Sequence, residues 1–227
     1  MSLPKIIDNN RRVLKDTLDQ LCENYDEISI ATGYWDLPGT QLLIDKLESF
    51  KKIRILIGQE PLAPRYKKSN PEIDFPDQDI FSDLEMLEQT SSYKDLIVRI
   101  RTLIEEDKLE VKIYKKTFFH AKAYIFGNYG SDENVAIIGS SNFTRAGLTG
   151  NTELNSVEAD GRIITSMPKT ETQEIGHLFW FDQFWNEAEE WTGEFSRLLS
   201  TSTVGDQMFS PYEMYIATLY QIYKEEL

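Results

Sequence analysis

The stretch at residues 117–155, TFFHAKAYIFGNYGSDENVAIIGSSNFTRAGLTGNTELN, decides the expected fold of this chain. It contains three apolar or alternating runs, which predict strands over 118–126, 135–139 and 152–159. Polar side chains stand near the ends of these runs. His120 and Lys122 are two residues apart, so in a strand both side chains leave the same face. Ser140 and Asn142 repeat that spacing at the end of the second run.

These residue types suit the binding of an anionic tetrahedral group beside a nucleophile. Lysine supplies positive charge, asparagine and serine supply neutral hydrogen-bond donors, and imidazole can attack phosphorus or move protons. Arg145 lies close in sequence to Asn142 and is a further candidate for phosphate contact. The stretch therefore predicts a phosphate-binding site.

The rest of the chain surrounds this stretch with alternating helices and strands. Further strands are predicted over 27–35, 52–58 and 109–114. Helices are predicted over 5–24 and 172–195, and one or two helices over 81–107. A further helix, with Asp36 as its cap and Pro38 in its first turn, is predicted to continue over 41–50. Residues 59–80, with four prolines, predict a long surface loop. This β-α-β rhythm predicts an α/β fold in which a mixed, largely parallel sheet carries helices on both faces.

Composition limits the function classes. The net charge of −14 argues against a surface that binds nucleic acid broadly. Residues 111–130, however, contain four lysines and no acid, and we expect this basic island to face phosphate. Cys22 is the only cysteine, and the sequence shows neither a signal-peptide core nor a membrane-spanning run. We expect a cytoplasmic protein that does not bind membranes.

The motifs His120-Ala121-Lys122 and Gly139-Ser140-Ser141-Asn142 resemble the signature of the phospholipase D superfamily. Gly127 stands where that signature has an aspartate, and the spacer to the second motif is longer than usual. Glu153, eleven residues after Asn142, is similar to the acidic residue that nuclease-type members carry at that distance. The resemblance implies a phospholipase D-like fold.

The same resemblance implies phosphodiester hydrolysis without a metal or any other cofactor. His120 would attack phosphorus to form a phosphohistidine, and Glu153 would hydrogen-bond the His120 ring. The family's site uses two H-x-K motifs whereas this sequence has one, so a homodimer joined through the active-site face is expected. The implied catalytic residues are His120, Lys122, Asn142 and Glu153, the implied substrate-binding residues are Ser140 and Arg145, and no metal ligands are implied.

DNA is the expected substrate, because Glu153 resembles the nuclease branch and because related proteins continue into a helicase-type domain. Two alternatives stay open: a catalytically silent DNA-binding or dimerisation module of a helicase or restriction-type protein, suggested by Gly127, and a phospholipid phosphodiesterase. Residues 1–198 are predicted to form the catalytic domain. Residues 199–227 are predicted to form a linker and a C-terminal helix leading to a further domain, and no Walker-type motif occurs in the sequence.

Overall fold

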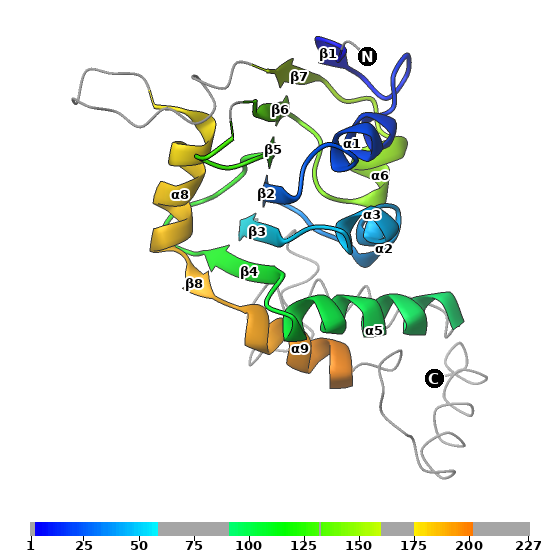
Figure 1. Ribbon diagram of the computed structural model, residues 1–227, viewed down its shortest axis with the longest axis vertical. Coiled ribbons are helices and arrows are strands. Elements are labelled where there is room, and N and C mark those ends of the chain that lie inside the picture. The colour runs from blue at the N-terminus through cyan, green and yellow to red at the C-terminus, as the bar shows by residue number, and fades with distance from the viewer. Residues whose placement is uncertain (1–2, 59–90, 132, 160–174, 202–227) are drawn as a thin grey trace, which may run out of the picture.

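The computed structural model describes residues 3–58, 91–131, 133–159 and 175–201 (Figure 1). The expected loop at 59–80 and most of the expected C-terminal segment lie outside these ranges. The described elements are, in chain order, β1 (Ile6–Ile7), α1 (Leu14–Cys22), β2 (Glu27–Thr32), α2 (Leu37–Gln41), α3 (Ile44–Leu47), β3 (Lys52–Gly58), α5 (Ser91–Glu105), β4 (Leu109–Tyr114), β5 (Ala123–Phe126), β6 (Val135–Gly139), α6 (Arg145–Thr149), β7 (Asn155–Glu158), α8 (His177–Glu187), β8 (Glu189–Glu190) and α9 (Thr192–Thr201).

The strands form one sheet in the order β1-β7-β6-β5-β2-β3-β4-β8. The pairs β2–β3 and β3–β4 are parallel. The other pairs in the described sheet are antiparallel. The predicted mixed α/β sheet with helices on both faces is confirmed, with a smaller parallel share than expected. Strand β5 pairs antiparallel with β2 and with β6, and β6 pairs antiparallel with β7. The connection between β5 and β6, residues 127–134, is too short for the crossover that a parallel pair needs.

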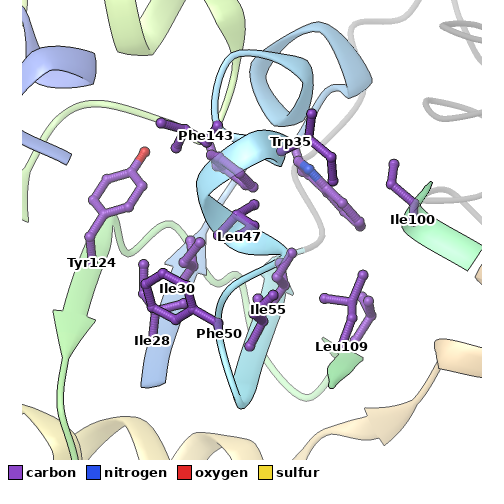
Figure 2. Close-up of a cluster of buried hydrophobic side chains, with 14 of the residues drawn as sticks. Ile28, Ile30, Trp35, Leu47, Phe50, Ile55, Ile100, Leu109, Tyr124 and Phe143 are labelled. Carbon is purple, nitrogen blue, oxygen red and sulfur yellow. The ribbon is translucent and has the colours of Figure 1, made fainter. Parts of the chain in front are cut away.

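Two apolar layers hold the helices against the sheet. Helix α8 covers one face, and helices α1, α2, α3, α5, α6 and α9 lie on the other (Figure 1). In β3, Ile53 and Ile55 point into the larger core, whereas Leu56 points to the α8 side, as the two-residue period of a strand requires. The larger core also buries Phe50 and Leu109 (Figure 2).

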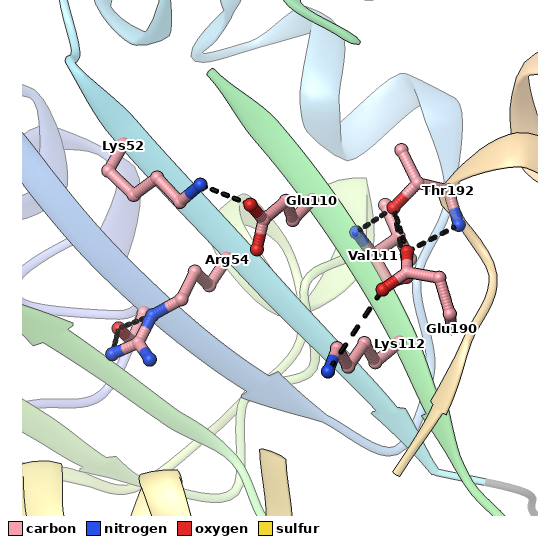
Figure 3. Close-up of polar contacts among 8 residues, drawn as sticks. Lys52, Arg54, Glu110, Val111, Lys112, Glu190 and Thr192 are labelled. Atoms are coloured by element: carbon pink, nitrogen blue, oxygen red, sulfur yellow. Dashed lines mark hydrogen bonds and ion pairs between the residues drawn. The ribbon is translucent and has the colours of Figure 1, made fainter. Parts of the chain in front are cut away.

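The α8 face also carries polar side chains, which pair with one another. Arg54 on β3 donates to Ser29 Oγ and to Asp182 Oδ1 of α8, the latter at 2.7 Å, and its guanidinium lies 4.8 Å from the Phe181 ring centre. Lys52 pairs with Glu110 across the parallel strands (Figure 3). Arg54 thereby joins α8 to the middle of the sheet.

Three predicted elements differ from the structure at the two ends of the described chain. The helix expected over 5–24 begins only at Leu14, because Ile6 and Ile7 pair with β7 at the sheet edge. The helix expected over 172–195 is interrupted, since Ala188 adopts an extended conformation and residues 189–190 pair with β4. Helix α9 then continues past residue 198, and Leu199 is fully buried in the larger core.

Candidate active site at one end of the sheet

The signature residues gather where four strands begin or end. Strand β2 ends at Thr32 and β6 ends at Gly139, while β5 and β7 start at this same end of the sheet. Backbone hydrogen bonding continues slightly beyond the strands: Gly139 N donates to Lys122 O at 3.2 Å, and Ser140 N donates to Leu154 O at 3.2 Å. Antiparallel pairing therefore brings the two motifs, far apart in sequence, into neighbouring positions.

The segment that carries His120 is a connection and not a strand. The predicted strand over 118–126 starts only at Ala123, because the chain must first cross from β4 over the ends of β3 and β2 to reach the far side of β2. Gly58, the last residue of β3, allows this crossing: a Cβ there would lie 1.9 Å from Phe119 O. Phe119 is buried against Tyr114 and Trp180, which anchors the crossing segment.

His120 and Lys122 differ in their surroundings. His120 is exposed, and its ring stacks on the ring of Phe118, with centroids 5.4 Å apart and planes inclined by 16°. Lys122 is only 7% exposed, and its Nζ donates to the backbone oxygen of His120 at 3.1 Å. The lysine side chain thus reaches back to the histidine, so that a positive charge lies beside the backbone of the proposed nucleophile.

Asn142 is oriented by the end of β2. Its Oδ1 accepts from Tyr34 N at 3.0 Å and lies 3.4 Å from Thr32 Oγ1. The Thr32 hydroxyl also accepts from Phe143 N at 3.0 Å, which ties the second motif to β2. Because the amide oxygen is held in this way, the amide nitrogen faces the other direction and remains a donor for an anionic ligand.

Ser140 and Glu153 contact each other directly. The Ser140 hydroxyl donates to Glu153 Oε2 and accepts from Leu154 N at 3.0 Å. The other Glu153 oxygen accepts from Asn151 Nδ2 at 3.3 Å. Both oxygens of Glu153 are thus engaged at this end of the sheet, and the hydrogen bond from Glu153 to the His120 ring stays a prediction.

Arg145 is exposed at the first turn of α6. Its backbone N donates to the Asp36 carboxylate at 3.0 Å, and Asp36 also caps α2 by accepting from Gly39 N at 2.6 Å. Burial of this carboxyl raises the pKa of Asp36 above its ordinary value, against the lowering effect of its backbone hydrogen bonds. The Arg145 guanidinium makes no ion pair among the described residues.

Gly127 lies at the opposite end of β5 from Lys122. Its φ of +97° favours glycine, and an added Cβ would lie 1.9 Å from Asn134 Oδ1. Five residues of extended chain span roughly 17 Å. An acid at this position would therefore lie far from the signature side chains, and its absence removes no group from the site.

The basic island predicted from sequence is largely neutralised. Lys115 pairs with Glu189 and Lys116 with Glu187, both at 3.2 Å, while Lys112 lies 4.0 Å from Glu190 (Figure 3). The acids come from the end of α8 and from β8, far away in sequence. The expectation of a phosphate-facing island is wrong for these three lysines, and Lys122 is the member that reaches the site.

Sequence reasoning missed three residues that shape the site, namely Thr32, Tyr34 as a backbone donor, and Phe118. Thr32 and Tyr34 hold Asn142 from a strand 110 residues earlier, which no local pattern reveals. Phe118 is a different case, since its place two residues before His120 in an alternating run was a usable signal. Trp35, which follows Tyr34, is buried in the core.

Within the described ranges, no group of three or more His, Cys, Asp or Glu side chains is arranged to hold a metal ion. His177 Nε2 lies 2.6 Å from Glu158 Oε2 on β7. Every helix in these ranges falls short of the length and apolar character that crossing a bilayer requires.

Comparisons with known proteins give one family and several structural likenesses. The family model described as "Cardiolipin synthase, PLD-like domain" matches residues 18–170. Phosphatidylserine synthase from Haemophilus influenzae Rd KW20 is similar in fold, with a TM-score of 0.50 and 14% identity, over 99% of this chain and 48% of that one. No curated protein matches significantly.

Two smaller structures are matched over nearly their whole length. Nuc from Salmonella typhimurium, described as a phospholipase D family member, has a TM-score of 0.45 and 11% identity over 82% of this chain and 95% of that one. NucT from Helicobacter pylori has a TM-score of 0.41 and 10% identity over 82% of this chain and 96% of that one.

Proposed function

The chain belongs to the phospholipase D-like family, and from that premise we propose that it is a metal-independent phosphodiesterase that cleaves DNA through a phosphohistidine. One observation carries the proposal most: Lys122, Ser140 and Asn142 meet at one end of the sheet, under the segment that carries His120. This end of the sheet combines an imidazole with cationic and neutral hydrogen-bond donors, the set of groups that transfer of a phosphoryl group requires.

The first chemical step uses His120 as the nucleophile. A ring nitrogen attacks phosphorus, the P–N bond forms, and the P–O bond to the leaving nucleotide breaks. A second imidazole gives its proton to the leaving oxygen and then takes a proton from water. That water attacks the phosphohistidine, which releases the phosphate product and restores His120.

The other signature residues stabilise the charge on the non-bridging oxygens. Lys122 Nζ and Asn142 Nδ2 donate to these oxygens, and the positions of both donors are set before substrate binds. Arg145 contributes a more distant charge. We assign Glu153 to the His120 ring in the loaded site: once the Ser140 hydroxyl turns to the substrate, Glu153 Oε2 can accept from the ring instead.

We assign the second imidazole to another copy of the chain. Only two histidines occur in the sequence, and His177 is held by Glu158 on β7. In a two-fold dimer the partner subunit's His120 supplies the leaving-group proton. The exposed position of His120 is compatible with such a shared site.

The silent-module alternative loses its main support, because Gly127 lies at the far end of β5 and is required there by its φ of +97°. The phospholipid alternative is retained as an arm of the test, since the matching family model is described by a phospholipid enzyme. It uses the same His120 chemistry and differs in substrate alone.

The test measures cleavage of single- and double-stranded DNA, and of phospholipid vesicles, in EDTA. Wild type is compared with His120→Ala and with His177→Gln as the matched control. We expect DNA cleavage that His120→Ala abolishes and His177→Gln leaves within about twofold. DNA cleavage that persists in His120→Ala, or turnover of phospholipid in place of DNA, contradicts the proposal.

A mixing experiment tests the shared site. Wild type and His120→Ala subunits are exchanged in equal amounts after the mass of the protein in solution has been measured. If each site needs two histidines, only wild-type homodimers are active and the activity per total protein falls to about one quarter. A fall to about one half shows that each subunit works alone.

A further inference from the structure

An exposed aromatic ring stands beside the proposed nucleophile. Phe118 is 60% exposed although it is large and apolar, and its ring lies nearly parallel to the His120 ring at 5.4 Å. The next residue, Phe119, is 4% exposed and packs between Tyr114 and Trp180. Phe118 is therefore held in place by its anchored neighbour and is not simply a loose surface side chain.

The size and position of this ring suit a nucleobase. A base stacked on the free face of Phe118 would lie about 3.4 Å from that ring, and the His120 ring centre lies 5.4 Å from the Phe118 ring centre, so the base and the nucleophile are about one nucleotide length apart. A base stacked on Phe118 would consequently belong to a nucleotide next to the phosphate attacked by His120. Stacking on aromatic rings is the usual means by which proteins hold single strands without reading their sequence.

The surrounding charge argues against recognition of a duplex by its phosphates. Tight duplex binding neutralises several phosphates with free lysines and arginines. Here Lys112 in β4, and Lys115 and Lys116 directly after it, pair with the acids at 187–190. Where the chain is described, affinity must therefore come largely from contacts other than a broad cationic surface.

We propose that Phe118 is a substrate-binding residue that stacks an unpaired base beside the scissile phosphate and so makes single-stranded nucleic acid the preferred substrate. A base inside a duplex has both faces covered by its neighbours, so it cannot stack on Phe118 without being extruded. This inference rests on the proposed nuclease activity and names the substrate class of the same site.

The test compares the variants Phe118→Trp and Phe118→Leu with wild type, on one sequence in single-stranded and duplex form. Phe118→Leu keeps an apolar side chain but has no aromatic face. We expect it to raise KM for the single strand about 5- to 100-fold, with kcat and duplex cleavage little changed, whereas Phe118→Trp keeps the wild-type KM. Leu154→Ala is the matched control, because Leu154 is 64% exposed next to Glu153 but offers no ring.

A binding measurement separates this inference from the nuclease proposal. His120→Asn protein is titrated into a single strand that contains 2-aminopurine, whose fluorescence is quenched by stacking. Quenching that is lost in the double variant with Phe118→Leu supports the inference even if wild type cleaves nothing. Two results overturn it: an equal fall in kcat on both substrates, which indicates that Phe118 only orients His120, or dissociation of a dimer in Phe118→Leu, which indicates a subunit contact.

Discussion

Replacement of Gly127 by alanine should destabilise the fold strongly. Its φ of +97° lies in a region of backbone conformation that costs an L residue about 1–3 kcal/mol of stability. The new Cβ would also lie 1.9 Å from Asn134 Oδ1, and Asn134 is only 1% exposed, so overpacking adds about 1–3 kcal/mol. The sum, about 2–6 kcal/mol, is a large part of the stability of a typical domain.

The assay is equilibrium unfolding in urea, followed by fluorescence. Gly193→Ala is the control, because a Cβ at Gly193 meets nothing within 4 Å and alanine in a helix should stabilise by a few tenths of a kcal/mol to about 1 kcal/mol. Asn134→Ala should remove the clash and recover part of the loss in Gly127→Ala, while the backbone strain remains. A loss below about 1 kcal/mol in Gly127→Ala, or no recovery in the double variant, would refute this account.

Two further outcomes follow from buried polar groups. Because burial raises the pKa of Asp36, its ionisation should weaken the fold as pH rises from about 4. The free energy of unfolding of wild type minus that of Asp36→Asn should therefore fall between pH 4 and 7. Urea titrations that show a constant difference would contradict this. Arg54→Gln should cost about 2–4 kcal/mol, because it removes the half-buried ion pair that ties Asp182 of α8 to the sheet, although the Tyr129 hydroxyl still donates to that carboxylate. Arg197→Gln, which removes an exposed ion pair, should cost under about 1 kcal/mol in the same denaturation assay. Equal effects of the two arginine substitutions would show that the α8 network contributes little.

The strands were predicted well where a local pattern determines them. The strands at 52–58, 109–114 and 135–139 have the predicted bounds, because continuous or alternating apolar runs are buried on both faces of the sheet. Asp36 was correctly predicted to cap a helix with Pro38 in its first turn. These features depend on residues within one or two turns of each other.

What sequence reasoning missed depends on partners far along the chain. Ile6 and Ile7 form an edge strand only because β7 is available almost 150 residues later. The pairing of Lys115 with Glu189 likewise needs α8 to end beside β4. The candidate site was predicted as a set of residues, but the contact between Ser140 and Glu153 could not be inferred from their spacing.

The path of the chain through the sheet also sets the order in which the protein can be completed during synthesis. The parallel strands β2, β3 and β4 leave the ribosome before the other strands of the middle of the sheet and can pair with one another. The crossing segment that carries His120 follows, and its partners at Gly139 and Leu154 emerge later still. Strand β1, although made first, has to wait for β7 before it can pair. A nascent chain should thus lack an assembled candidate site until the segment around residue 155 has left the ribosome.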